Sequence, residues 1–170
     1  MWDLLNSFEH TAFRLEVRDR YDESDEAGSL AKFLAGEPDD LPWMQEWLDL
    51  VREAREGGRS FSRVRVVTVP LTDYSRFGLW CAQFTNEAGE DIRYLARDQA
   101  DVAGVPKHDY WLFDSTTLVR MDFDDADGFL GTELITDPSQ VVKHNYWRDA
   151  AWHHAVRRDD FAGQQHRGRD

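Results

Sequence analysis

The chain has 170 residues, of which 41% are hydrophobic and 13% aromatic, so it fits one folded domain and does not have the composition of a disordered chain. Its net charge of −13, from 33 acidic and 20 basic side chains, disfavours direct nucleic-acid binding and favours a basic partner. No apolar run reaches the length of a membrane span, no signal-peptide pattern opens the sequence, and the single cysteine excludes an internal disulfide, so we expect a cytoplasmic protein.

Hydrophobic periodicity predicts three helices and two strands in the first half of the chain. Apolar and charged residues alternate after residue 12, which is typical of a half-buried strand. Apolar residues three and four apart predict the second and third helices, and glycines after each can end them. The expected elements are a helix over 4–10, a strand over 12–21, a helix between Ser24 and Gly36, a helix over 43–56 and a strand over 61–69.

The second half begins with a helix that Thr72 can cap and ends with a long helix that follows Asp137-Pro138. Between them we expect a strand over 90–95, a helical turn over 98–104 and a three-strand meander over 110–113, 117–123 and 129–135. The last helix is expected to run through Val142, Tyr146, Trp152 and Val156.

These elements predict an α+β fold with a mixed or mostly antiparallel sheet, a C-terminal three-strand meander, helices packed on the sheet and a long C-terminal helix. We expect one domain over residues 1–162, followed by a disordered polar tail over 163–170.

Arginines with interspersed carboxylates occupy one side of each predicted strand, the side that we expect to lie opposite the core. If the strands are neighbours, these residues form an Arg-rich sheet face that suits phosphate, carboxylate or the acidic side chains of a partner. The helix start after Thr72 could add backbone N–H groups. The alternative is a solvated face with cross-strand ion pairs. The candidate ligand-binding residues are Arg14, Glu16, Arg18, Arg63, Arg65, Asp73, Tyr74, Arg76, Asp91, Arg93 and Arg120.

The sequence predicts no metal site and no cofactor. In the Asp-rich stretch 122–128, setting Gly128 at the sixth position of a calcium loop puts Phe123 at the first, where an oxygen ligand is needed. Cys81 lies mid-helix on an apolar face, where a thiol is usually packing. No nucleophile elbow, phosphate-binding loop or dinucleotide fingerprint occurs in the chain.

Six segments, spread from about Phe8 to Ala155, together carry a resemblance to a known family: residues 12–16, 63–67, 70–77, 88–93, 109–114 and 147–152. In these segments the chain resembles an actinobacterial domain of unknown function, whose members are typically encoded beside helix-turn-helix regulators of the XRE type. The resemblance implies a small partner of a transcriptional regulator, and it identifies no residue as catalytic.

Three functional hypotheses follow. The leading one is a regulatory accessory protein that binds a DNA-binding transcriptional regulator and senses a small anionic ligand at the Arg-rich face. The second is an enzyme, such as a toxin-like effector, on a phosphorylated or nucleotide-like substrate. In that enzyme Arg14, Arg65 and Arg93 would bind the anion, and the general base would be Glu16, Asp73 or Asp91. The third is a structural interaction module without a ligand.

Overall fold

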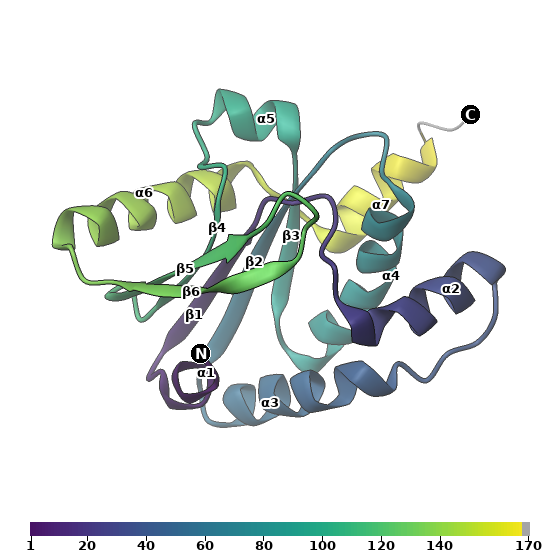
Figure 1. Cartoon of the computed structure of the whole chain (residues 1–170), viewed down its shortest axis with the longest axis horizontal. Helices are drawn as coiled ribbons and strands as arrows, with labels where there is room; N and C mark the ends of the chain where they lie inside the picture. Colours follow the sequence, from purple (N-terminus) through teal and green to yellow (C-terminus); the bar gives the residue numbers. More distant parts are fainter. Residues whose placement is uncertain (168–170) are drawn as a thin grey trace.

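A seven-stranded mixed sheet forms the centre of the computed structural model, which describes residues 1–167 (Figure 1). The strands are β1 (Thr11–Glu16), β2 (Ser60–Val67), β3 (Asp91–Ala96), β4 (Asp109–Phe113), β5 (Thr117–Phe123), β6 (Phe129–Ile135) and β7 (Val156–Arg157). The helices are α1 (Trp2–Ser7), α2 (Ala27–Ala35), α3 (Gln45–Glu56), α4 (Asp73–Ala88), α5 (Arg97–Val102), α6 (Pro138–His154) and α7 (Arg158–Arg167). Two short 3-10 helices, η1 (Ser24–Glu26) and η2 (Pro42–Met44), precede α2 and α3. The predicted α+β class is confirmed.

The strand order is β6-β5-β4-β1-β2-β3-β7. Strands β1, β2 and β3 are parallel neighbours, whereas β4, β5 and β6 form the predicted antiparallel meander on the other side of β1. Parallel neighbours require a crossover connection, and here α2 and α3 lie between β1 and β2 and α4 lies between β2 and β3. The sheet is therefore covered by helices where the parallel strands lie.

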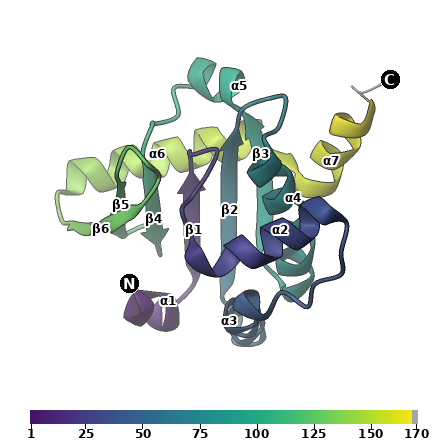
Figure 2. The ribbon, with the colours of Figure 1, turned by 45° about the vertical axis from the view of Figure 1, so that its right-hand side comes forward.

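The two faces of the sheet have separate hydrophobic cores. One face, here called the α3–α4 face, packs against α2, α3 and α4, with Phe61, Phe77 and Trp111 in its core. The opposite face, here called the α6 face, packs against α5 and α6 through residues such as Leu15 and Val64. Figure 2 shows α2 in front of strands β1–β3 and α6 behind them. Both faces of the parallel part are thus buried, as is usual for parallel strands.

Local capping explains where the two longest helices begin. The Thr72 hydroxyl accepts a hydrogen bond from the Ser75 backbone N–H at 3.0 Å, and the Asp137 carboxylate accepts one from the Ser139 N–H at 2.9 Å. Gly36 ends α2 in the left-handed conformation, with a φ of 70°. These predicted boundaries are confirmed.

Four boundaries or faces differ from the predictions. Strand β1 stops at Glu16 because the next N–H, of Val17, donates to the Asp109 side chain instead of a neighbouring strand. Helix α6 leaves Val142 and Tyr146 70% and 67% exposed, and it ends before Val156, which pairs with β3 in β7. Residues 163–167 continue α7 where a disordered tail was expected, and 168–170 lie outside the described residues.

The helices within residues 1–167 include none that is both long enough and apolar enough to cross a membrane.

Candidate functional site

Register brings three arginines together on the α3–α4 face. Arg14 of β1 lies opposite Arg63 of β2, and Glu16 lies opposite Arg65 one pleat further along. We call Arg14, Arg63 and Arg65 the arginine cluster. The alternative of a solvated face is wrong for Arg14 and Glu16, which are only 4% and 7% exposed beneath the crossover helices, although cross-strand ion pairs do form there.

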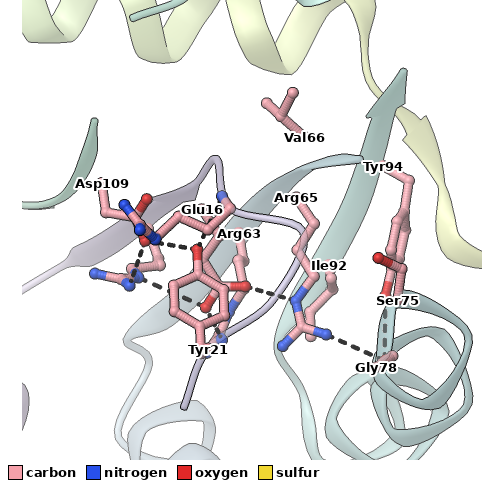
Figure 3. A network of polar contacts seen from close by, with 12 residues as sticks. Glu16, Tyr21, Arg63, Arg65, Val66, Ser75, Gly78, Ile92, Tyr94 and Asp109 are labelled. Atoms are coloured by element: carbon pink, nitrogen blue, oxygen red, sulfur yellow. Dashed lines mark hydrogen bonds and ion pairs between the residues drawn. The ribbon is translucent and has the colours of Figure 1, made fainter. Parts of the chain in front are cut away.

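Glu16 lies at the centre of this cluster (Figure 3). Its carboxylate oxygens accept hydrogen bonds from Arg63 Nη1 and Arg65 Nε, both at 2.6 Å, and Arg14 Nε lies 3.6 Å away. Burial alone would raise the pKa of Glu16, but the charges of the three arginines outweigh burial and lower it to about 2. Glu16 is therefore ionised over the physiological pH range.

Two further buried carboxylates complete the ion pairs. Asp109 accepts from Arg14 Nη2 at 2.8 Å and from the Tyr21 hydroxyl at 2.7 Å. Glu90, which is 2% exposed, accepts from Arg63 Nε at 2.8 Å and from the indole N–H of Trp47 at 3.0 Å. We call Glu16, Glu90 and Asp109 the inner acids. They match the arginine cluster charge for charge, which makes burial of the cluster possible.

Arginine N–H groups are nevertheless left over at this site. Arg14 Nη1 is buried and has no hydrogen-bond partner in the described chain. The Nη2 groups of Arg63 and Arg65 also donate to no acceptor among residues 1–167, and these side chains are 12% and 25% exposed. A buried donor without an acceptor costs about 1–3 kcal/mol, so leftover donors are typical of a site that is completed by a ligand.

A cavity of about 540 Å³ lies over the arginine cluster, between the sheet and residues of α1, η1, η2, α3 and α4. Its walls include Trp43, Trp47 and Trp111, and we call it the tryptophan pocket. The Arg63 guanidinium lies 5.5 Å from the Trp47 ring centroid, and that of Arg14 lies 5.7 Å from the Trp111 centroid. Apolar walls with a few convergent polar groups are typical of small-molecule sites, and the volume fits such a ligand.

Helix α4 positions Arg65 through a glycine. The Gly78 carbonyl accepts from Arg65 Nη1 at 3.1 Å and from the Tyr94 hydroxyl at 3.2 Å (Figure 3). A Cβ atom at residue 78 would lie 2.6 Å from Arg65 Nη1, so no larger residue fits without displacing the guanidinium. Cys81, one turn further along α4, also lines the pocket, and burial raises the pKa of its thiol to about 12. Cys81 is therefore protonated and a poor nucleophile.

The other predicted site residues lie elsewhere. Arg18 pairs with Asp127 at 2.8 Å, and Arg76 pairs with Asp73 at the exposed start of α4. On the α6 face, Arg93 pairs with Asp91 at 3.0 Å and lies 3.8 Å from the Trp152 ring centroid.

Arg120 pairs with Asp122 and Glu133 at 3.0 and 2.7 Å, away from the pocket. Tyr74 lies near the site, since its hydroxyl donates to Glu26, which lines the pocket, at 2.7 Å. Of the eleven candidates, Arg14, Glu16, Arg63 and Arg65 thus contact one another at the pocket, whereas the pairs Asp73–Arg76 and Asp91–Arg93 lie outside it.

Sequence reasoning missed the partners of the cluster. Asp109 alternates with Trp111 and Phe113 along β4, and this period-two pattern could have placed it on the same face as the tryptophan. Glu90 and Gly78 carry no such signal, because their roles depend on contacts across the sheet and with α4.

A comparison with curated proteins gives no match. A profile for a domain of unknown function, DUF6879, matches residues 1–163. The match covers all seven strands and the whole tryptophan pocket. The chain therefore belongs to the DUF6879 family of domains of unknown function.

Proposed function

We propose that the protein is a regulatory accessory protein that binds a small acidic ligand in the tryptophan pocket and acts, in the cytoplasm, on a DNA-binding transcriptional regulator. The observation that carries the ligand is the pair of Nη2 groups of Arg63 and Arg65, which donate to no acceptor among residues 1–167 and belong to side chains that line the cavity. A carboxylate or phosphate would accept from these groups, as the planar guanidinium geometry favours. The net charge of −13 supports a basic partner such as a DNA-binding protein.

The contacts give less support to an enzyme. Glu16 is held by three arginines at a pKa of about 2, which makes it a weak base at neutral pH. The other two candidate bases, Asp73 and Asp91, form ion pairs outside the pocket. Arg93 lies on the α6 face, so it cannot share an anion with Arg14 and Arg65.

A module without a ligand is also less well supported. Such a module gives no role to a cavity of about 540 Å³ lined by Arg63 and Arg65, whose Nη2 groups donate to no acceptor among residues 1–167. Retaining both features is understandable if a ligand supplies the missing acceptor and fills the volume.

Calorimetric titration with 3-phenylpropionate and its neutral analogue 3-phenylpropanamide tests the ligand. We expect the acid to bind at least about tenfold more tightly, because only its carboxylate can pair with the guanidinium groups. Arg65→Gln should weaken binding of the acid by about 10- to 100-fold, which corresponds to the loss of a hydrogen bond to a charged group. Arg120→Gln is the matched control, since Arg120 lies away from the pocket and should leave affinity unchanged.

A second pair of variants tests the location without disturbing the ion pairs. Thr132 and Leu134 are both exposed and lie two residues apart on β6, but only Thr132 lines the pocket. Thr132→Trp should obstruct the pocket and abolish binding, whereas Leu134→Trp should not. Equal binding of acid and amide, or equal effects of these two variants, would show that this pocket is not an acid-binding site.

A further inference from the structure

The tryptophan pocket also contains two carboxylates that have no cationic partner. Glu23 precedes η1, Glu26 is its last residue, and both line the same cavity as the arginine cluster, so we call them the outer acids. Glu26 is half-buried, and its Oε2 accepts only the Tyr74 hydroxyl among residues 1–167. Glu23 is exposed at the edge of the pocket, and its carboxylate accepts no hydrogen bond from residues 1–167. In contrast to the inner acids, neither outer acid contacts a guanidinium among the described residues.

The charge balance of the site follows from these contacts. The arginine cluster supplies three positive charges, which the three inner acids already match. The two outer acids then give the pocket a net charge of −2 when they are ionised. Burial raises the pKa of each outer acid and outweighs the opposing charge of Arg14 near Glu23 and of Arg65 near Glu26.

These charges restrict the ligand. A ligand with only negative charge, such as a nucleotide, would meet free guanidinium N–H groups but also two unpaired carboxylates in the same cavity. A ligand with only positive charge would leave the guanidinium N–H groups without acceptors. A ligand that carries both charges satisfies both groups at once.

Resting on the proposed function, we infer that the ligand of the tryptophan pocket is zwitterionic, an amino acid or a small derivative of one. Its acidic group pairs with the free N–H groups of Arg63 and Arg65, and its ammonium group pairs with the outer acids. Its apolar side chain packs against Trp43 and Trp47, and a cavity of about 540 Å³ has room for such a molecule.

Two matched sets of compounds test separately how the acidic group and the ammonium group of the ligand contribute to affinity. The first is phenylalanine, 3-phenylpropionate and 2-phenylethylamine, and the second is leucine, 4-methylpentanoate and 3-methylbutylamine. Within at least one set, we expect the amino acid to bind at least about tenfold more tightly than the acid or the amine in calorimetry, because each analogue leaves one group of the pocket unpaired.

The double variant Glu23→Gln/Glu26→Gln should remove the preference for the amino acid over the acid while retaining binding of the acid. The control is Glu37→Gln/Glu46→Gln, which changes the net charge equally at exposed positions outside the pocket and should retain the preference. If the acid binds as tightly as the amino acid in both sets, the zwitterion inference fails and the acid-binding function stands. If none of the six compounds binds at about 10 mM, both fail.

Discussion

At the scale of single residues, the Glu16 carboxylate accepts hydrogen bonds from Arg63 and Arg65 at 2.6 Å while it is only 7% exposed. We predict that Glu16→Gln lowers the free energy of unfolding by about 3–5 kcal/mol at pH 7, because it removes the charge that balances buried guanidinium groups. Urea unfolding measures this loss. Glu133→Gln is the control, since its partner Arg120 is 41% exposed and such a pair contributes less than about 1 kcal/mol.

The same residue predicts a defined pH dependence. The pKa of Glu16 is lowered from 4.5 to about 2, so its ionisation stabilises the fold above pH 4.5. That contribution, about 3 kcal/mol, is lost as the pH falls from 4.5 to 2. The stability difference between wild type and Glu16→Gln should therefore shrink over this range. A difference that stays constant down to pH 2 would show that the carboxylate charge does not stabilise the fold.

At the scale of secondary-structure elements, a histidine pair joins α6 to the residue before β4. His108 Nε2 and His144 Nε2 lie 2.9 Å apart, and His144 Nδ1 donates to the Gln140 carbonyl at 2.7 Å. Because a carbonyl only accepts, neutral His144 must carry its proton on Nδ1, and His108 must donate to its Nε2. Protonating both rings would put two N–H groups face to face.

Acid should therefore weaken the packing of α6. Burial and the neighbouring His144 lower the pKa of His108 from 6.5 to about 4, and burial also lowers the pKa of His144. Neutral imidazoles then stabilise the fold above pH 6.5, and this stability is lost as the pH falls from 6.5 to 4. We expect a loss of about 1–2 kcal/mol between pH 7 and pH 5, measured by urea unfolding.

His108→Gln should lose less stability over that interval than wild type. His10→Gln is the control, because the side chain of His10 is 79% exposed and lies 3.9 Å from the exposed carboxylate of Glu9, away from the histidine pair. Identical pH profiles for wild type and His108→Gln would contradict a role for the pair. The window ends near pH 4, so it overlaps little with the range in which Glu16 is protonated.

Local patterns were sufficient to predict most elements and insufficient to predict the site. The Thr72 cap and the apolar stripe through Phe77 identified α4, because both signals lie within a few residues of the helix. In contrast, an alternation of arginine and apolar residues does not distinguish a buried arginine face from a solvated one, because both give the same pattern along a strand. Burial of Arg14 and Glu16 follows from the parallel pairing of β1 and β2 beneath α3 and α4. Pairing between strands so far apart in the chain is not encoded in either strand alone.

At the scale of the whole molecule, the inner acids neutralise the arginine cluster, so the net charge of −13 comes from the remaining residues. We predict that the protein binds a basic helix-turn-helix regulator, the partner that we propose, through electrostatic attraction to this negative charge. The complex should co-elute in size-exclusion chromatography at about 50 mM NaCl and separate at about 1 M, where the Debye length falls to about 3 Å. Separate elution at both salt concentrations would rule out a charge-driven complex with the regulator tested.

The same charge predicts competition with DNA for the regulator. A regulator's DNA-contacting surface is basic, so an acidic protein that covers it should displace the DNA at low salt. Titration of this protein into a regulator–DNA gel shift should release free DNA as the complex forms. If the proteins co-elute but the gel shift never changes at any excess, the acidic surface binds the regulator away from its DNA-binding surface, and regulation by competition is wrong. The Glu37→Gln/Glu46→Gln variant, which keeps the tryptophan pocket intact, should weaken the complex if charge at these exposed positions drives association.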